Sequence, residues 1–544
     1  LLDDADVATL DGTATTNTWF QGTSYTTTMT CDALNRVVTS TTPDASVTRN
    51  AWNQGGLLSS VEVEVRGDTP ATPMVRSIDY NARGQRTSIV YSKNAGDTDG
   101  AFTTAYDYDP ETFRLTRLRT IRESDSIRLQ DLTYTYDACG NIVHIGDGAQ
   151  QDHFYDNTYV DPAMKYQYDS LYRLVSAQGR EHDSVGQPAD VEPDLLTNPG
   201  DGNDSRTYVE TYTYDEVGNI LRMKHQEGTE ASPGTVLWHR GYVYEVDSNR
   251  LVKTSLPGDD VEDPGDYSAV DYATNDRGAM VEMPHLDGIV RQFDDQIRSV
   301  DINGSDDAVY HYDAAGNRVR KVYRHGNVEE RVYLGAFEIY FKDTDDLVRE
   351  TLHVMDDQRR VAMIETKTIE GGVEDVDPSI FRFQLGNHLE SAAVEVDEEG
   401  AIISYEEYHP YGTTAWWASS SALVSQKRYR YTGKEKDEET GLAYHGARYY
   451  APWLARWERA DPSGLQGGMN RYEYARGSPA ALVDLTGRAP GAPPGRTERF
   501  KPDGTPAYGA GDPDLAHAAR VAERYRGSNV VPWGSPASSL WISD

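Results

Sequence analysis

Hydrophobic and polar positions alternate with a period of two over much of this chain. In Thr133-Tyr134-Thr135-Tyr136 the alternate side chains share one face, as they do on a half-buried β-strand. Such segments end at short turns rich in Asp, Gly and Asn, which are residues that favour tight turns. The pattern therefore predicts an all-β chain of many short antiparallel strands.

The strand and its turn form a unit that repeats. Each unit ends a strand in Tyr-Asp, turns at Gly or Asn, and resumes with aliphatic residues. Clear copies begin at Tyr108, Tyr136, Tyr168, Tyr214 and Tyr312, and weaker copies at Cys31, Tyr80, Tyr244 and Phe293. The Asp is expected to accept backbone N–H bonds, while Gly or Asn takes the positive-φ position. One hairpin is too small to be stable alone, so neighbouring units are expected to pair into a long, curling sheet.

The amino-acid composition of the chain agrees with thin β-sheets that are exposed to solvent on one face. The chain has 36 Tyr against 10 Phe, 38% hydrophobic residues and a mean hydropathy of -0.66. A Tyr ring packs while its hydroxyl still reaches water or a backbone partner. The two Cys, Cys31 and Cys139, cannot build a disulfide framework. The start at Leu1, without a signal sequence, is expected of a fragment of a longer chain.

The charge argues against nucleic acid as a partner, and the hydrophobicity pattern argues against a membrane span. A net charge of -36 repels phosphate backbones, so nucleic-acid binding is not expected. No apolar run approaches the roughly 20 residues that span a bilayer, so no membrane span is expected. The acidic residues favour solubility, and they could also attract a basic cargo or line a cavity.

Longer segments make the repeat specific. These are IDYNARGQR at 78–86, LTYTYDACGNI at 132–142, and YRL at 172–174 followed by GREH at 179–182. They resemble the YD repeats of the RHS family, which occurs in bacterial polymorphic toxins, Tc insecticidal toxin complexes and teneurins. The SpvB/Tc-type toxin polypeptides are the most similar, over most of residues 30–487. The resemblance implies that residues 1–332 form a YD-repeat spiral β-sheet, a hollow shell or cocoon that encloses a C-terminal toxin.

The sequence pattern changes from residue 333. The motifs EEYHPYG at 406–412, YRYTGKEKD at 429–437 and GLAYHGARYY at 441–450 resemble the RHS-associated core domain that caps such a shell. This domain is expected over 333–488. The Pro/Gly-rich stretch that follows has the composition of a linker. The resemblance implies a variable effector beyond the core domain, so residues 489–544 are expected to be a linker and the start of a variable C-terminal effector.

Two Asp-x-x-Gly turns near the end of this block are the strongest candidates for chemistry. They begin at Asp461 and Asp484. The resemblance implies that these two aspartates form an intramolecular aspartyl protease that cuts just after the second turn, at Arg488-Ala489 or within one residue of it. Two neighbouring carboxyls can share a proton, so that one activates water while the other polarises the scissile carbonyl.

Four nearby residues are candidates for supporting roles. Gly464 and Gly487 are expected to let the backbone approach the carboxyl pair closely. Arg456 and Arg459 could stabilise a carboxylate or oxyanion, or instead pair with the acidic surface. Asp-Pro is also an ordinary turn opener, so each turn taken alone could be scaffold.

Other chemistries find little support. The later histidines lack the His-x-x-x-His or Cys spacing of zinc sites, and we expect no metal there; they are His353, His388, His409 and His445. Gly-x-Ser-x-Gly, P-loop and dinucleotide motifs do not occur, so no cofactor is expected. Glu406 and Glu407 are adjacent on an expected strand and would face opposite sides, which disfavours a carbohydrate hydrolase.

Two hypotheses for function remain. The first is a toxin-encapsulating shell that releases its own C-terminal effector by self-cleavage and turns over no external substrate. Its partners would be the enclosed effector and other Tc-complex components such as a translocation pore, in a secreted or extracellular bacterial toxin. The alternative is a cell-surface adhesion or ligand-binding YD-repeat protein without cleavage.

Overall fold

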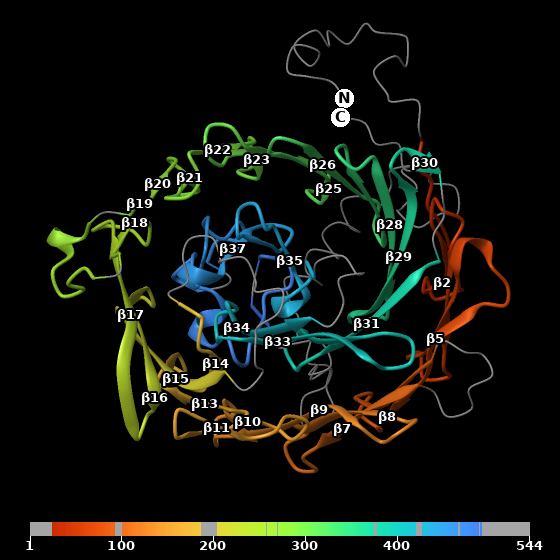
Figure 1. Ribbon diagram of the computed structural model, residues 1–544, viewed down its shortest axis with the longest axis horizontal. Helices are drawn as coiled ribbons and strands as arrows, with labels where there is room; N and C mark the ends of the chain where they lie inside the picture. The colour runs from red at the N-terminus through yellow and green to blue at the C-terminus, as the bar shows by residue number, and fades with distance from the viewer. Residues whose placement is uncertain are drawn as a thin grey trace, which may run out of the picture.

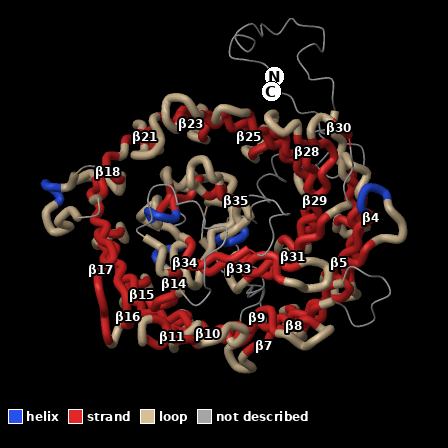
Figure 2. Tube along the Cα trace, viewed as in Figure 1, coloured by secondary structure: helices blue, strands red, loops and turns tan. Residues whose placement is uncertain are grey.

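The computed structural model describes residues 24–92, 101–186, 204–256, 258–268, 270–374, 378–419, 427–465, 468–488 and 490–491. Strands dominate these residues, and helix is confined to short 3₁₀ turns (Figure 2). Of the expected linker and effector, residues 489–544, Ala489 and residues 492–544 lie outside the described residues. No described helix is long and apolar enough to cross a bilayer.

The first sheet has 17 strands, and it holds most of the YD repeats. Its strands are β1 (Thr28–Cys31), β2 (Val37–Thr41), β3 (Val47–Trp52), β4 (Leu58–Glu64), β5 (Thr72–Tyr80), β6 (Arg86–Tyr91), β7 (Phe102–Tyr108), β8 (Leu115–Arg122), β9 (Arg128–Tyr136), β10 (Ile142–Asp147), β13 (Ala163–Tyr168), β14 (Leu174–His182), β15 (Ser205–Tyr214), β16 (Ile220–Thr229), β17 (Ser232–Tyr244), β18 (Leu251–Thr254) and β19 (Val270–Asp271). Two hairpins stand apart from it: β11 (His153–Tyr155) with β12 (Thr158–Val160), and β20 (Ala273–Thr274) with β21 (Met280–Glu282).

The second sheet has 13 strands, and a third of four strands lies in the C-terminal block. The second comprises β22 (Gly288–Arg291), β23 (Ile297–Asp301), β24 (Asp307–Tyr312), β25 (Arg318–Arg324), β26 (Val328–Tyr333), β27 (Phe337–Lys342), β28 (Leu347–Met355), β29 (Arg360–Glu370), β30 (Val373–Glu374), β31 (Ile380–Gly386), β32 (Ala392–Val396), β33 (Ile402–Tyr408) and β34 (Thr414–Ser419). The third comprises β35 (Glu435–Lys436), β36 (Ala443–Tyr444), β37 (Tyr449–Ala451) and β38 (Arg456–Trp457). The 3₁₀ turns are η2 (Val65–Gly67), η3 (Pro264–Asp266), η4 (Tyr431–Gly433), η5 (Pro452–Leu454) and η6 (Ala475–Gly477).

The repeat turns have the geometry that the sequence predicted. Asp137 Oδ1 accepts the N–H groups of Cys139, Gly140 and Asn141 at 2.9, 2.7 and 2.9 Å, and Gly140 has φ +101°. Asp215 and Asp313 likewise accept N–H bonds from the second and fourth residues after them. The positive-φ position therefore recurs because each aspartate closes the same turn.

The repeat tyrosines connect neighbouring units. The Tyr136 hydroxyl donates to the carbonyl of Leu115 at 2.7 Å, and Tyr108 donates to Arg86 at 2.9 Å. Each acceptor is the first residue of the strand that follows the turn of the preceding unit. Four further tyrosines, at 80, 168, 214 and 244, repeat the contact at 2.7–2.8 Å. The Tyr of the motif is thus a cross-unit hydrogen-bond donor as well as a packing side chain.

The sheets wind into a spiral that confirms the predicted YD-repeat β-shell. The first sheet runs from β2 and β5 at the right of the ring in Figure 1, along the bottom, to β17 at the left, and β22–β29 continue over the top and return to the right. The chain then turns inward through β31, β33 and β34, and the C-terminal strands lie inside the ring. An apolar core joins the two layers where the ring overlaps itself, with Val75 and Phe102 of the first sheet packed among Leu352 and Phe383 of the second.

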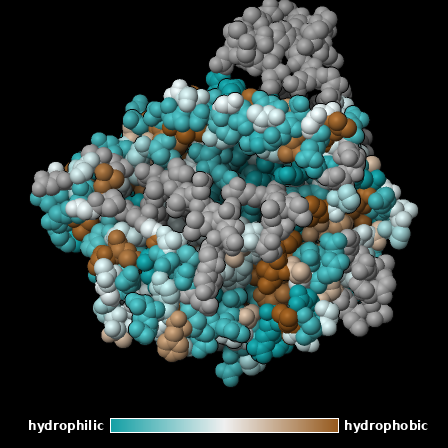
Figure 3. Space-filling view, in the orientation of Figure 1, coloured by the Kyte–Doolittle hydropathy of each residue, from teal (hydrophilic) through white to brown (hydrophobic). Residues whose placement is uncertain are grey.

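The C-terminal block packs onto the inner face of the wall through aromatic side chains. Tyr450, Trp457 and Tyr474 are almost fully buried in one cluster with wall residues such as Tyr212. The strand ladder crosses the expected boundary at residue 333 without a break, because β26 pairs with β27 there. That boundary stays a prediction drawn from the sequence pattern. The face seen in Figure 3 is mainly hydrophilic, in keeping with the acidic composition.

Candidate active site

The fold brings the two predicted aspartates together in the buried C-terminal block. Asp461 is 5% exposed and Asp484 is 0% exposed, although 23 positions separate them in the sequence. Arg448 bridges them, with its Nη2 atom 3.0 Å from Oδ2 of each carboxyl. Since both oxygens contact one nitrogen, they are at most twice that distance apart. The guanidinium also lies over the Trp457 ring, 4.1 Å from its centroid, which favours a bound cation.

The turn that begins at Asp484 is held from outside by three side chains, of which His445 and Arg448 are buried and Lys434 is partly buried. His445 Nδ1 contacts the Asp484 carbonyl at 2.6 Å, and Lys434 Nζ donates to the Leu485 carbonyl at 2.6 Å. Arg448 Nε donates to the Gly487 carbonyl at 2.7 Å. Within the turn, Asp484 Oδ1 accepts the N–H of Arg488 at 3.1 Å. The residue before the expected cut is therefore fixed to one of the two aspartates.

The turn that begins at Asp461 contacts the carbonyl of Arg488 through a side chain. Asp461 Oδ1 accepts the N–H of Ser463 at 2.7 Å and lies 2.6 Å from Ser463 Oγ. That hydroxyl oxygen is also 2.7 Å from the Arg488 carbonyl oxygen. A hydroxyl has one proton but two acceptor lone pairs. Ser463 can therefore receive a proton from Asp461 while it donates its own to Arg488.

The backbone is held again just beyond the expected cut. Gly491 N donates to the Val483 carbonyl at 2.8 Å, and Val483 N donates to the Gly491 carbonyl at 3.0 Å. Ala489 itself lies outside the described residues. The chain is thus fixed at Arg488 by the two aspartate turns and at Gly491 by a β-bridge.

Burial dominates the electrostatics of the cations around the pair. It lowers the pKa of Arg448 from its ordinary value, although Asp461 and Asp484 oppose the shift. It also lowers the pKa of Lys434 to about 8, with Arg360 adding to the effect and Asp484 opposing it. Burial holds the pKa of His445 well below its ordinary value, so this ring is neutral near pH 7 and donates from Nδ1.

The two predicted glycines have different roles. Both adopt positive φ, +77° at Gly464 and +68° at Gly487. A Cβ atom at Gly487 would lie 2.8 Å from the backbone nitrogen of Arg448, whereas one at Gly464 would meet no atom within 4 Å. Close backbone approach therefore explains Gly487, and Gly464 is explained by its turn conformation alone.

Arg456 and Arg459 contact backbone instead of the carboxyl pair or the acidic surface. Both are buried, at 5% and 7% exposed. Arg456 Nη2 donates to the Asn249 carbonyl at 2.8 Å, and Arg459 Nη1 donates to the Asp294 carbonyl at 2.5 Å. The sequence suggested two uses for these arginines, and the described contacts correspond to neither. They tie the C-terminal block to the turns of the shell wall.

Sequence reasoning missed Arg448 and Ser463. Arg448 is one of several cations in its segment, and nothing in its spacing links it to either aspartate. Ser463 carried a usable signal, because a Ser two residues after an Asp commonly bonds that carboxylate. Only the fold brings its hydroxyl to the Arg488 carbonyl.

A second group of polar side chains lies apart from this pair. Among the described residues, Glu181, His225 and His409 are the one group of three whose potential metal-ligating atoms converge. The sequence predicted no metal at His409.

Comparison with curated proteins finds similarity along most of the chain. Toxin subunit YenC2 of Yersinia entomophaga is 33% identical over 492 residues, which is 86% of this chain and 48% of that protein. The chain spans about half the length of toxin subunits YenC1 and YenC2. No family model matches the sequence.

Solved structures agree with this similarity. The crystal structure of TcdB2-TccC3-Cdc42 superposes with a TM-score of 0.73 at 31% identity, covering 86% of this chain and 22% of that one. A structure of TcdB2-TccC3 without its hypervariable C-terminal region matches with the same TM-score at 30% identity, covering 86% of this chain and 22% of that one. The similarity therefore does not depend on that region.

Proposed function

Because the chain belongs to the RHS/YD-repeat Tc toxin family, we propose that its shell encloses a C-terminal effector and that the chain cuts itself at Arg488-Ala489. The effector would begin at Ala489 and remain inside as separate cargo. The assembly would act as a secreted bacterial toxin component together with other Tc subunits, including a translocation pore. The proposal is consistent with the relatives, which are named as toxin subunits.

The arrangement around Arg488 is the observation that carries the self-cleavage proposal. Its N–H is bonded to Asp484, and its carbonyl oxygen lies 2.7 Å from Ser463 Oγ, which contacts Asp461. An ordinary scaffold turn needs only the first of these contacts. Placement of a carbonyl between two carboxyl-bearing turns is what an intramolecular aspartyl protease requires.

In the proposed reaction each aspartate takes up one proton and gives up one proton. Asp484 takes a proton from a water molecule whose oxygen adds to the Arg488 carbonyl carbon. Asp461 passes its proton to Ser463 Oγ, which gives its own to the carbonyl oxygen. The tetrahedral intermediate then collapses, and the C–N bond breaks as Asp484 protonates the nitrogen of Ala489. The hydroxyl proton returns to Asp461 through Ser463, which leaves a carboxylic acid at Arg488 and an amine at Ala489.

Arg448 would hold the pair in position for this chemistry. Its Nη2 atom contacts both carboxyls, while its Nε atom contacts the Gly487 carbonyl. One guanidinium charge offsets one buried carboxylate, which is otherwise costly to bury. The reaction then needs a single proton on the pair, as in other carboxyl dyads.

Substitution of each aspartate tests the proposal directly. Asp461→Asn and Asp484→Asn should each abolish cleavage, because an amide can neither share the proton nor act as the base, although its size is nearly unchanged. Cleavage of the 544-residue chain after Arg488 would separate the last 56 residues, roughly 6 kDa of 60.6 kDa. Mass spectrometry of the denatured protein would report this fragment and the cut position.

Asp313→Asn is the matched control. Asp313 opens an Asp-x-x-Gly turn of the same form in a YD repeat, and its substitution should leave cleavage intact. Full processing in both dyad variants would end the aspartyl-protease assignment. An uncleaved wild-type chain would instead support the adhesion or ligand-binding alternative.

A further inference from the structure

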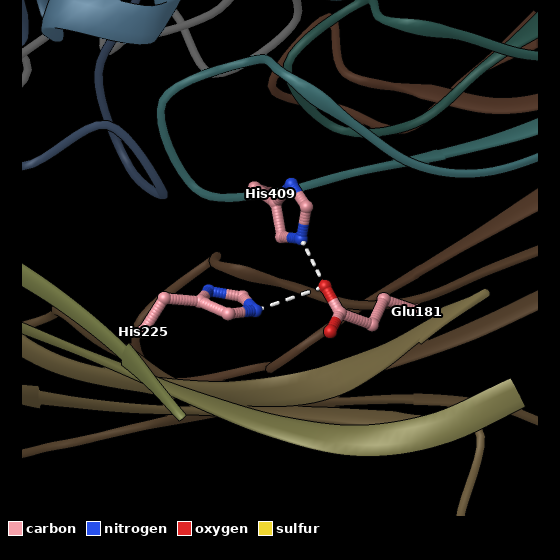
Figure 4. A group of neighbouring side chains, drawn as sticks. All are labelled: Glu181, His225 and His409. Carbon is pink, nitrogen blue, oxygen red and sulfur yellow. Dashed lines mark hydrogen bonds and ion pairs between the residues drawn. The ribbon is translucent and has the colours of Figure 1, made fainter. Parts of the chain in front are cut away.

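Three buried side chains from distant parts of the sequence meet between the shell wall and the inner layer (Figure 4). Glu181 lies on β14, His225 on β16, and His409 in the turn between β33 and β34. Their side chains are 0%, 1% and 3% exposed. Nε2 of each histidine is 3.0 Å from Oε2 of Glu181, and the three atoms lie within 4.8 Å of one another.

Outer contacts fix the orientation of all three side chains. Nδ1 of His225 lies 3.1 Å from Glu210 Oε1, and Nδ1 of His409 lies 2.9 Å from Thr413 Oγ1. The second carboxylate oxygen of Glu181 accepts a bond from Arg206 Nε at 2.9 Å. Each outer atom therefore has its own partner, and each inner atom points toward the other two. Metal-binding histidines are typically held in this way, through the ring nitrogen that does not bind the metal.

Aromatic packing makes the site rigid. The His225 ring is stacked between Tyr208 and Trp238, each with its centroid 5.0 Å away. Tyr208 also meets the His409 ring edge to face, at 4.8 Å between centroids. Because these side chains are already ordered, little conformational entropy would be lost when a ligand binds, which favours affinity.

We propose that Glu181, His225 and His409 form a zinc site that ties the inner layer to the shell wall. Two imidazole nitrogens and one carboxylate oxygen form a ligand set that suits Zn²⁺ and leaves a fourth position for water. The charged groups in hydrogen-bonding contact at the site are Glu181 itself, Glu210 and Arg206, whose sum is negative. A bound dication is therefore compatible with the charge of the pocket.

Zinc would replace protons that occupy the site in its absence. Without metal, both Nε2 atoms must carry a proton to donate to Glu181, and His225 also donates from Nδ1 to Glu210 when it is charged. On binding, His225 would lose its Nε2 proton to solvent. The His409 proton would move to Nδ1, where the Thr413 hydroxyl can accept it. Binding should thus release one proton, from the charged His225, and weaken at acid pH.

The site would give this shell a cross-link that its cysteines do not supply. Cys31 and Cys139 are free and exposed. The ligands stand 44 and 228 residues from Glu181 in the sequence, so a bound ion would join three segments that motif spacing could not associate. Such a link should stabilise the folded chain in proportion to its zinc affinity.

Metal titration of the full chain tests the proposal. After treatment with a chelator, the protein should take up one equivalent of Zn²⁺ per chain and unfold at a higher temperature. Co²⁺ in its place should give the intense visible spectrum of a tetrahedral site. Glu181→Gln and His409→Asn should each lose this binding, and Thr413→Ala, which removes only an outer contact, should weaken it about 10–100-fold.

His353→Asn provides the control. His353 is buried beside Glu338 at 2.9 Å, but it belongs to no described group of three ligands, so the variant should bind one equivalent as the wild type does. Circular dichroism would verify that each variant is folded. Less than about a tenth of an equivalent in the wild type, or equal uptake by the wild type and the Glu181 variant, would overturn the proposal and leave a hydrogen-bonded network alone.

Discussion

Single side chains in this protein act through the backbone groups they hold. The carbonyls of the Asp484 turn are fixed by His445, Lys434 and Arg448, and the Arg488 peptide is fixed by Asp484 and Ser463. The contacts of His445, Lys434, Arg448 and Asp484 are buried or partly buried, where a lost hydrogen bond is expensive, whereas the contact between Ser463 and the Arg488 carbonyl is exposed. The candidate site is therefore defined by short contacts of individual atoms.

Ser463 provides a specific prediction at this scale. Ser463→Ala should slow self-cleavage by about 10²-fold, because it removes the hydroxyl that would relay a proton to the Arg488 carbonyl. Ser463→Thr, which retains a hydroxyl, should keep most of the rate. The measurement is the rate at which freshly folded chain is converted to two fragments. An unchanged rate in the Ala variant would remove Ser463 from the mechanism.

The raised pKa of Glu473 predicts that the stability of the folded chain depends on pH. Burial raises the pKa of Glu473 to about 7, against the opposing effects of Arg173 and Arg476. The folded state thus binds this proton more tightly than the unfolded state, and wild-type stability should fall as pH rises from about 4.5 through about 7. Glu473→Gln should be more stable than the wild type at pH 8 by on the order of 1–3 kcal/mol, with no advantage near pH 4.5.

Thermal unfolding of both proteins at pH 4.5 and pH 8 would measure this difference. Glu216→Gln, at an exposed turn position, controls for the loss of one surface charge. A Glu473→Gln advantage that is the same at both pH values would contradict the predicted titration.

Elements in this fold depend on their neighbours in the repeat. A strand pair alone is marginal, and in six of the YD units the tyrosine adds a hydrogen bond to the unit before it. The same turn at the same place keeps the register of successive strands, because a slip by one residue would exchange the buried and exposed faces. Regularity along the wall therefore arises from a short motif that is copied.

The tyrosine contact can be measured at one unit. Tyr136→Phe removes only the hydroxyl that donates to the Leu115 carbonyl, and it should lower the free energy of unfolding by about 1 kcal/mol. Tyr159→Phe is the control, because that ring is 49% exposed and its hydroxyl contacts an exposed carboxylate. Denaturant titration of the two variants should separate them. Equal, negligible losses would assign the repeat tyrosines to packing alone.

The whole molecule is a spiral whose later part lies within its earlier part (Figure 1). The inner layer contacts the wall through apolar side chains and through ion pairs such as Arg86–Asp356 at 2.7 Å and Arg180–Glu407. Inner and outer parts must therefore fold together for either to bury its surface. This arrangement is suited to enclosing a segment that follows the C-terminal block.

The enclosing shell predicts that the C-terminal tail, residues 489–544, is protected from added protease. Residues 489–496 have a Pro/Gly-rich composition that is readily cut by proteases when it is exposed. If the shell encloses the tail, an added protease should digest residues 489–544 slowly in the native state and quickly after denaturation. Mass spectrometry over a time course would follow the fragments. Equal rates in both states would favour the adhesion alternative.

The sequence by itself determined the local structure and the family. Its two-residue period and its Tyr-Asp turns specify strands and turns, because those depend on neighbours a few residues away. The same copied motif carried the resemblance to RHS shells, and the two Asp-x-x-Gly turns marked Asp461 and Asp484 as a candidate pair.

Only the tertiary structure decided which distant residues meet. Arg448 between the aspartates, Ser463 at the Arg488 carbonyl, and His409 beside Glu181 and His225 all depend on how the spiral closes on itself. Arg456 and Arg459 lie near Asp461 in the sequence, yet the fold turns them toward the shell wall. Contacts of this kind have no sequence period, because they are set by the packing of whole layers and not by the local geometry of a strand or turn.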